Sequence, residues 1–356
     1  MRTAHPPTDA TAGSKMRTGS ELLQATKPFA VEDAATTWRL AASTLALLVL
    51  AFAGAVYPGW PLPGRIAAAV LLGLVTVRWF IFYHDYLHSA IWTRSRLGKV
   101  LMHLSGFWFL APVSVWRETH NYHHKNNAKL VGSAIGSFPT VTTGMWRGMN
   151  EKQRRAYRIA RHPLTIFGGY FTVFIFGMCI SAFLRSRKHW QGPAALLLHF
   201  GGAAALSYFV DPWSGLLGVI LPLFIASGLG TFLFYVQHNF PQAEFRSRRD
   251  WDYVHAALKS SSMFDMSPVM HWFTGNIGYH HVHHLNHRIP FYRLPEAMAA
   301  IPELQSPGRV SWRLSDIASC LRLRLWDPER GRMVGFDEVP EETTPTAGIR
   351  TEAAGA

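Results

Sequence analysis

Three short histidine-rich stretches decide the fold of this chain: HDYLH at residues 84–88, HNYHH at 120–124 and HHVHH at 280–284. On a helix, residues three or four positions apart lie on one face, with their Cβ atoms about 5–6 Å apart. Each stretch can therefore aim two or three imidazoles at one point. Imidazole is a good ligand for iron, zinc, copper and nickel. Together the stretches predict a site in which eight imidazoles hold two metal ions.

The composition points to a membrane protein. The 356 residues are 49% hydrophobic and only 16% charged, whereas soluble domains carry about 25% charged residues. The net charge of +13, from 35 Lys and Arg against 22 Asp and Glu, would suit nucleic acid or an anionic membrane face. The long apolar runs favour the membrane, where basic residues collect on cytoplasmic loops. Cys179 and Cys320 form no CxxC pair, which excludes a ferredoxin-like or zinc-ribbon module.

Six apolar stretches approach the length of about 20 residues that a membrane span requires. All three histidine stretches must face one metal site, so they must lie on one side of the membrane. Two of the six stretches therefore cannot cross, and we expect these to be 97–113 and 163–184, the second of which has basic residues at both ends. The four expected spans are about 38–56, 64–83, 194–210 and 214–236, which leaves the site and both termini in the cytoplasm.

We therefore predict an all-α integral membrane fold with four transmembrane helices, two non-crossing embedded segments and a cytoplasmic helical cap that carries the metal site. The membrane domain is expected to cover residues 38–326, with short cap helices near 250–259, 293–302 and 312–325. Residues 1–37 are polar and residues 327–356 are rich in Glu, Thr, Pro and Gly. These compositions predict a disordered cytoplasmic N-terminal tail and a mostly disordered C-terminal tail.

From about residue 75 to 300 the chain resembles the membrane fatty acid desaturases, and among them the bacterial acyl-lipid desaturases. The resemblance is strongest in FYVQH at 234–238, in WFTGNIGYHHVHHL at 272–285 and in the following IPFYRL at 289–294. It implies two irons on the cytoplasmic side, with ligands carried over by position. The implied ligands are His84, His88, His120, His123, His124, His280, His283 and His284, with His238 as the ninth.

Desaturation removes two hydrogens from unactivated methylene groups, which no acid or base can do, and metal centres supply the O2 chemistry that it needs. We therefore expect an O2-dependent desaturase that introduces a double bond into a fatty acyl chain of a membrane lipid in a bacterial inner membrane. Neither HPGG nor a GxGxxG motif on a strand–turn–helix occurs, so no built-in haem or flavin is expected. The electrons would come from an external donor such as ferredoxin, and no nucleic-acid partner is expected.

Residues beside the ligands are candidates to fix the imidazoles by accepting their second N–H. For the asparagines among them, a helix cap or a turn is an equally good interpretation. His281 should face another way on its helix and is not expected to be a ligand. The second-shell candidates are Asp85, Asn121, Asn239 and Asn276.

The acyl chain needs a long apolar tunnel that ends at the metals. Leu87 stands where related desaturases often carry a small residue before the second histidine of the first stretch, and its larger side chain could reshape this tunnel. Ordinary helix packing is the competing interpretation for every tunnel candidate. The candidates are Phe107, Trp108, Phe109, Gly228, Gly230, Phe232 and Phe234.

Two alternative functions remain open from the sequence. The first is a fatty acyl or carotenoid hydroxylase or ketolase of the same diiron fold, which product mass would distinguish from a desaturase. The second is a metal transporter or sensor, which would place ionisable residues near the middle of the bilayer. The expected spans contain no Asp or Glu, and His199 is their only histidine, so this alternative is disfavoured.

Overall fold

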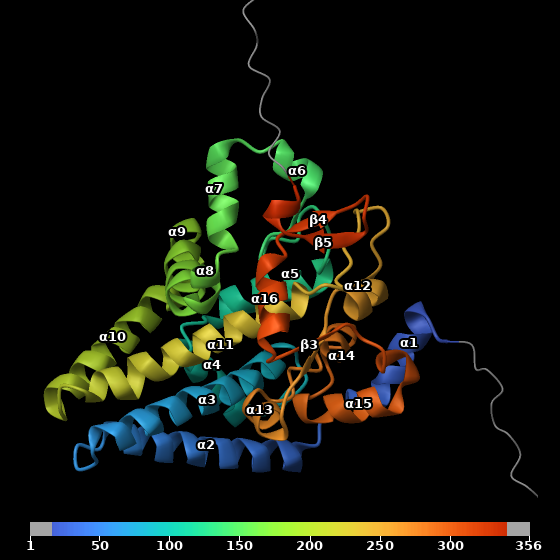
Figure 1. The fold of residues 1–356 in the computed structure, drawn as a ribbon. Coiled ribbons are helices and arrows are strands. Elements are labelled where there is room, and N and C mark those ends of the chain that lie inside the picture. Colours follow the sequence, from blue (N-terminus) through green and yellow to red (C-terminus); the bar gives the residue numbers. More distant parts are fainter. Residues whose placement is uncertain (1–15, 340–356) are drawn as a thin grey trace, which may run out of the picture.

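The computed structural model of the protein describes residues 16–339 and is mainly helical (Figure 1). Within these residues, four helical stretches are long and apolar enough to cross a membrane, judged by length and composition. They are Ala34–Val56, Leu62–Leu87, Arg187–Phe209 and Leu216–His238. The first two are helices α2 and α3; the others contain α10 (Gln191–Phe209) and α11 (Leu221–His238). These four stretches confirm the four apolar helices expected from the sequence, with bounds shifted by a few residues.

The four long helices form two hairpins that are tied together at the end away from the histidines. Asp33 caps α2 by accepting hydrogen bonds from the amides of Ala35 and Thr36. At the far end, the guanidinium of Arg65 donates from Nη2 to Asp211 Oδ2 at 2.6 Å and to the Ser214 hydroxyl at 3.0 Å. Its Nε donates to the carbonyl of Ala55 at 3.0 Å. Because Arg65 is buried, this pairing offsets the cost of removing its charge from water.

We predict that Arg65→Met lowers the melting temperature, because it removes the hydrogen bonds of the guanidinium to Asp211, Ser214 and Ala55 and leaves the Asp211 carboxylate without its cation. Thermal unfolding of the purified protein in detergent, followed by circular dichroism, measures the effect. The exposed Arg96, in the first turn of α4 (Arg96–Trp108), provides the matched control Arg96→Met. Equal melting temperatures for the two variants would contradict the prediction.

Two further apolar segments separate the hairpins in sequence. Helix α4 has 13 residues and is therefore about 20 Å long, shorter than the roughly 30 Å hydrocarbon core. The second segment consists of α8 (Pro163–Phe167), a π-helix at Tyr170–Ser181 and α9 (Ala182–Arg185). That both segments enter the membrane without crossing it stays a prediction.

Short helices and two small sheets surround the histidine-bearing ends of the long helices, from the top of Figure 1 down its right-hand side. Strands β1 (Val141–Thr142), β4 (Leu325–Asp327) and β5 (Arg332–Val334) pair in that spatial order, and β2 (Met263–Asp265) pairs in parallel with β3 (Arg309–Ser311). The sheets were not expected from the sequence. The helices here are α5 (Val113–Asn126), α6 (Thr143–Arg147), α7 (Glu151–Ala160), α12 (Tyr253–Lys259), α13 (Pro268–Phe273), α14 (His280–Leu285), α15 (Leu294–Ala300) and α16 (Leu314–Arg322), with single 3-10 turns at Lys27–Phe29, Arg187–His189, Phe291–Arg293, Pro302–Leu304 and Phe336–Glu338.

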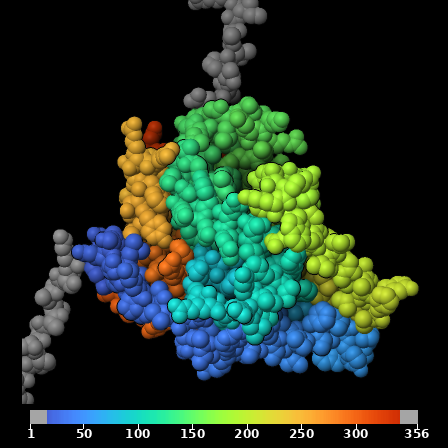
Figure 2. All heavy atoms as spheres, turned by 180° about the vertical axis from the view of Figure 1, so that it is seen from behind, coloured from blue at the N-terminus to red at the C-terminus, as the bar shows by residue number. Residues whose placement is uncertain are grey.

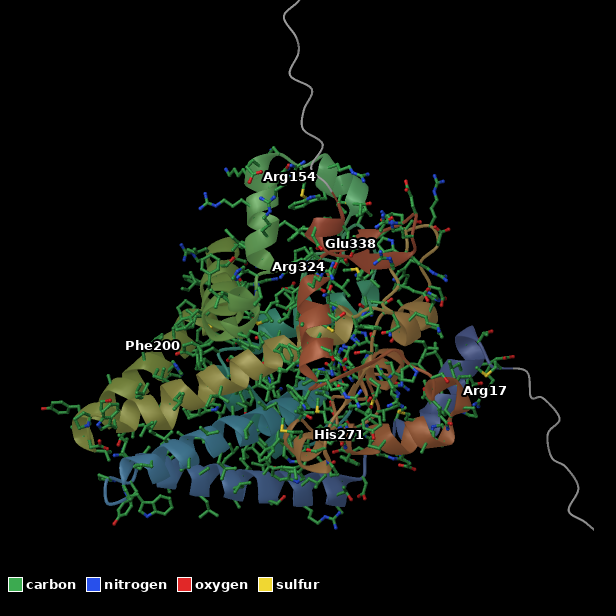
Figure 3. All side chains as sticks on the ribbon, in the orientation of Figure 1. Arg17, Arg154, Phe200, His271, Arg324 and Glu338 are labelled. Atoms are coloured by element: carbon green, nitrogen blue, oxygen red, sulfur yellow. The ribbon has the colours of Figure 1, made fainter. Side chains whose placement is uncertain are left out.

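Charged and apolar surfaces separate along the molecule. Figure 3 labels Arg154, Arg324 and Glu338 among the short elements at its top, and Phe200 on the long helix α10. Along α10 the side chains of Leu197 and Phe200 are exposed, as is expected of side chains that face lipid. The molecule therefore has one apolar part made of long helices and one polar part that covers their histidine-bearing ends.

The predicted terminal tails are wrong in part. Residues 19–26 form helix α1, and α2 already begins at residue 34. Leu22 is buried, and Arg17 forms an ion pair with Glu303 at 2.9 Å; Figure 2 shows α1 in blue against the orange C-terminal part. At the other end, residues 332–338 form β5 and a 3-10 turn. These contacts come from tertiary packing, which composition does not reveal. Residues 1–15 and 340–356 of the predicted tails lie outside the described residues.

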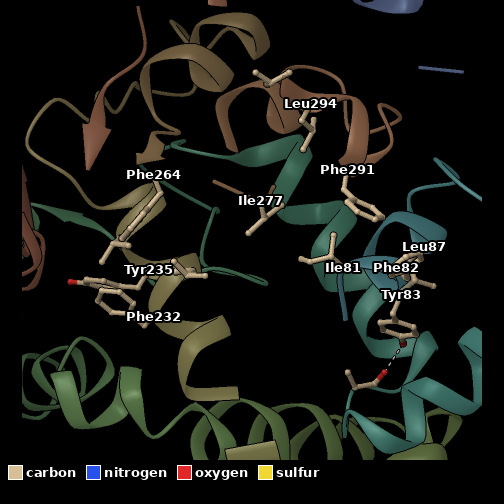
Figure 4. Close-up of a cluster of buried hydrophobic side chains, with 14 of the residues drawn as sticks. Ile81, Phe82, Tyr83, Leu87, Phe232, Tyr235, Phe264, Ile277, Phe291 and Leu294 are labelled. Atoms are coloured by element: carbon tan, nitrogen blue, oxygen red, sulfur yellow. Dashed lines mark hydrogen bonds between the residues drawn. The ribbon is translucent and has the colours of Figure 1, made fainter. Parts of the chain in front are cut away.

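A buried core connects α3, α11 and the loop before α14 (Figure 4). The rings of Phe82 and Phe291 lie 4.9 Å apart in an edge-to-face contact. The Tyr83 hydroxyl donates to the carbonyl of Ala111 at 2.5 Å, and Gln237 Nε2 donates to the carbonyl of Ile277 at 2.9 Å. Through these contacts the long helices fix the position of the third histidine stretch.

Candidate metal centre

Four elements bring the nine predicted ligands together. His84 lies on the last turns of α3 and His88 directly follows that helix, while His238 is the last residue of α11. The remaining six lie on one face each of α5 and α14, where the spacing of three and four residues aligns them. All are buried except His238, which is partly buried.

The imidazoles form two groups. The first group contains His84, His88, His120, His124 and His283. Each of these histidines places one ring nitrogen within 4.8 Å of a ring nitrogen of every other member. The second group, by the same measure, contains His123, His238 and His284. His280 joins the second group, because its Nε2 lies 2.9 Å from that of His238. The stacked rings of His124 and His284, 4.3 Å apart, connect the two groups.

The distances between nitrogen atoms fit metal coordination. Within the first group, His120 Nε2 lies 3.0 Å from His84 Nε2 and 3.2 Å from His124 Nε2. Within the second, His123 Nε2 lies 3.1 Å from His238 Nε2 and 3.3 Å from His284 Nε2. Nitrogen ligands about 2.1 Å from a metal are about 3.0 Å apart at right angles and about 3.4 Å apart in a tetrahedron. Both groups therefore have the size of a coordination sphere.

Hydrogen bonds to the second ring nitrogens set the tautomers of two ligands. His238 Nδ1 lies 3.0 Å from the carbonyl oxygen of Ser260, which can only accept, so this nitrogen carries the proton. His84 Nδ1 lies 3.1 Å from Asp85 Oδ1, and the other oxygen of Asp85 accepts from the amide of Phe291 at 2.7 Å. In the neutral rings Nε2 then holds a lone pair that points into the centre of each group.

The other candidates for fixing the ligands have different contacts. Asn239 donates to the carbonyl of Leu323 at 2.9 Å and accepts from Arg161. Asn276 donates to the carbonyl of Phe291 at 3.2 Å, and Asn121 lines a surface depression. Sequence reasoning thus placed Asp85 beside a ligand and missed Ser260, whose backbone contact has no sequence signal. His281 Nε2 lies 3.0 Å from the carbonyl oxygen of Leu304, outside both groups.

A tenth imidazole was also missed. The ring of His287 lies 4.7 Å from that of His88 and 5.1 Å from that of His124. His287 follows His284 by three residues, but α14 ends at Leu285, so its approach to the group depends on the turn after the helix and not on helical spacing. It is partly exposed and therefore forms part of the rim of the first group.

The pKa values of the histidines in both groups favour metal binding. Burial, reinforced by the neighbouring imidazoles, holds the pKa values of the histidines of α5 and α14 in both groups well below the usual value of 6.5. The same causes lower the pKa of His88. These rings are therefore neutral near pH 7, and a neutral imidazole is the form that binds a metal.

An apolar cavity of about 380 Å³ reaches both groups, at His84, His120 and His280. Of the predicted tunnel residues, Phe109, Gly230 and Phe234 line it. The other four do not line it; Gly228 lies against the Phe167 backbone and Phe232 stacks on the Phe167 ring. Leu87 is also absent from the lining and packs in the buried core (Figure 4).

Comparison with known proteins agrees with this site. Residues 61–315 match the sequence profile of the family described as fatty acid desaturase. The chain belongs to the fatty acid desaturase family. A fatty acid desaturase of Bacillus subtilis (strain 168) is 31% identical over 273 residues, which cover 76% of this chain and 77% of that protein.

More distant relatives carry more specific names. An sn-1 acyl-lipid omega-3 desaturase (ferredoxin) of Nostoc sp. (strain 36) is 24% identical over 64% of each chain. A Delta(12)-fatty-acid desaturase of Vernicia fordii is 23% identical over 69% of this chain and 66% of that protein. The family membership favours a desaturase over the transporter and over the hydroxylase or ketolase that the sequence alone left open.

Two neighbouring histidines of α14 provide a matched test of the ligand groups. We predict that His283→Gln lowers the metal content of the purified protein from about two ions per chain to about one or fewer. His281→Gln should keep about two, because His281 faces away from both groups. Elemental analysis by inductively coupled plasma mass spectrometry measures both. Equal metal content in the two variants would remove His283 from the ligand set.

The lowered pKa values predict how the metal-free protein responds to acid. Burial lowers the pKa of His281 and of His287 to about 4, so between pH 6.5 and about 4 the unfolded chain binds protons that the folded chain does not. Stability is therefore fully present above pH 6.5 and is lost as the pH falls towards 4. Melting temperatures of chelator-treated protein between pH 8 and pH 4.5 measure this. A melting temperature that stays constant over that range would contradict the prediction.

Proposed function

We propose that this chain is an O2-dependent desaturase that introduces a double bond into a fatty acyl chain of a membrane lipid. The observation that carries the proposal is the pair of converging histidine groups at one end of an apolar cavity. The nine histidines would hold two irons, five on one and four on the other. When bound, the irons supply the O2-dependent oxidising power that removal of hydrogen from methylene groups requires.

The residues around the site have distinct tasks in this proposal. Asp85 and the carbonyl of Ser260 keep the protons of His84 and His238 on Nδ1, so that Nε2 faces the metal. Trp116 stacks on His120, with ring centroids 4.9 Å apart, and limits the movement of that ligand. The apolar wall of the cavity binds the acyl chain and excludes water, which would otherwise compete with it.

Position and partners follow from the arrangement of the chain. We propose that the four long helices lie in a bacterial inner membrane, with the two shorter apolar segments embedded but not crossing. The histidine groups and both termini would be cytoplasmic, since basic residues collect at that end. An external donor such as ferredoxin would supply electrons, and the name of the Nostoc relative includes ferredoxin.

Expression of the chain in a bacterial host, with a ferredoxin and its reductase, tests the proposal. Gas chromatography–mass spectrometry of the host fatty acids should reveal chains two hydrogens lighter than their precursors. The same cells expressing His84→Ala should lack them. Products that gain an oxygen atom would instead support the hydroxylase or ketolase alternative, and an unchanged profile from metal-loaded protein would count against acyl lipids as the substrate.

A further inference from the structure

Two buried hydroxyl groups in the cavity wall have no hydrogen-bond partner among residues 16–339. They belong to Thr76 on α3 and Ser227 on α11, which are 0% and 3% exposed. Buried polar groups in proteins are nearly always paired, because an unpaired one has lost its hydrogen bonds to water without replacement. These two hydroxyls therefore require an explanation.

Other helix hydroxyls in this protein avoid the problem by bonding to the carbonyl one turn earlier. Thr44 donates to the carbonyl of Leu40, and Ser105 to that of Leu101, each at 2.7 Å. Thr231, four residues after Ser227 on the same helix, donates to the Ser227 carbonyl at 2.7 Å. Thr76 and Ser227 depart from this local rule, and both line the cavity.

The two hydroxyls lie at the end of the cavity remote from the polar cap. Thr76 precedes His84 by eight residues on α3, which corresponds to about 12 Å along the helix. Ser227 precedes His238 by eleven residues on α11, which corresponds to about 16 Å. The cavity also extends to the exposed Arg185 at the end of α9, where the anionic head group of a lipid would be favoured. An acyl chain with its head group there would pass the histidines and reach the hydroxyls with its tail.

We propose that Thr76 and Ser227 recognise a double bond already present in the tail of the acyl chain. The inference rests on the proposed function and adds that the preferred substrate is an unsaturated chain. A saturated tail offers a hydroxyl no acceptor, whereas the electron-rich face of a carbon–carbon double bond accepts a weak hydrogen bond. A charged group is excluded at this end, because Arg185 is the only Lys, Arg, Asp or Glu in the described lining and it lies elsewhere in the cavity, at the end of α9.

Competition between substrates tests the proposal. Metal-loaded, reduced protein is given mixed phospholipids whose acyl chains of equal length are saturated or carry one cis double bond at successive positions. The wild type should prefer the unsaturated chain at one position of the double bond. Thr76→Val and Ser227→Ala should each lower the ratio of kcat/KM values, unsaturated over saturated, by about two- to fivefold.

Thr172 provides the matched control. Its hydroxyl belongs to the same cavity wall but donates to the carbonyl of Thr165 at 2.9 Å, so Thr172→Val should leave the ratio unchanged. The inference is overturned if the wild type shows no preference, or if the preference survives in Thr76→Val and Ser227→Ala. Neither result contradicts the proposed desaturase function. If no chain is desaturated by metal-loaded protein, the proposed function fails and this inference with it.

Melting temperatures supply a readout that does not depend on activity. Replacing an unpaired buried hydroxyl by an apolar group of similar shape is neutral or stabilising, so Thr76→Val and Ser227→Ala should melt at the wild-type temperature or above it. Thr231→Val should melt lower, because its hydroxyl donates to the carbonyl of Ile166 at 2.6 Å. Loss of stability in all three variants would assign the two hydroxyls to the structure itself, for example through a trapped water, and would overturn the inference.

Discussion

The fold is arranged around imidazole nitrogens that face one another across about 3 Å. The Nε2 atoms of His84 and His120 are 3.0 Å apart, and those of His238 and His280 are 2.9 Å apart. Where Nδ1 keeps the proton, as in His238, the opposing Nε2 presents a lone pair. Burial keeps most of these rings neutral, which is the form that binds a metal. A cation at the centre of each group would be coordinated by these nitrogens.

The rest of the fold holds these rings in place. Helices α3 and α11 continue beyond their most apolar stretches and carry His84 and His238 at their ends. The two histidine groups are therefore connected directly to the long helices. The third histidine stretch lies on a helix of only six residues, which could not form alone. Its position depends on contacts such as those of Gln237 with Ile277 and of Asp85 with Phe291.

The same helices connect the chemistry to the proposed substrate. The side chains of α3 and α11 that face the cavity are mostly apolar, and hydroxyls are added by Thr76, Ser227 and Thr231. Each helix therefore contributes a candidate ligand at one end and part of the cavity wall along its length. A change in the angle between the helices would alter both the metal geometry and the shape of the cavity, which couples specificity to reactivity.

Several features of this protein could be derived from the sequence because they depend on local spacing or on the length of an apolar run. The four long helices and the alignment of His120, His123 and His124 on one face are of this kind. Family resemblance, rather than spacing, indicated the isolated His238. The folded segment at residues 19–37 and the small sheets could not be derived, because their stabilising partners, such as Glu303 for Arg17, lie far away in the sequence.

The sequence by itself therefore determined the type of candidate ligand, the number of long apolar helices and the face of each helix on which the histidines lie. Only the tertiary structure decided how nine histidines divide between two groups, that Ser260 fixes one of them, and that His287 lies at the rim. It also decided which hydroxyls remain unpaired in the cavity. The physical reason is that helical periodicity fixes directions within one element, whereas the distances between elements arise from packing among residues remote in sequence.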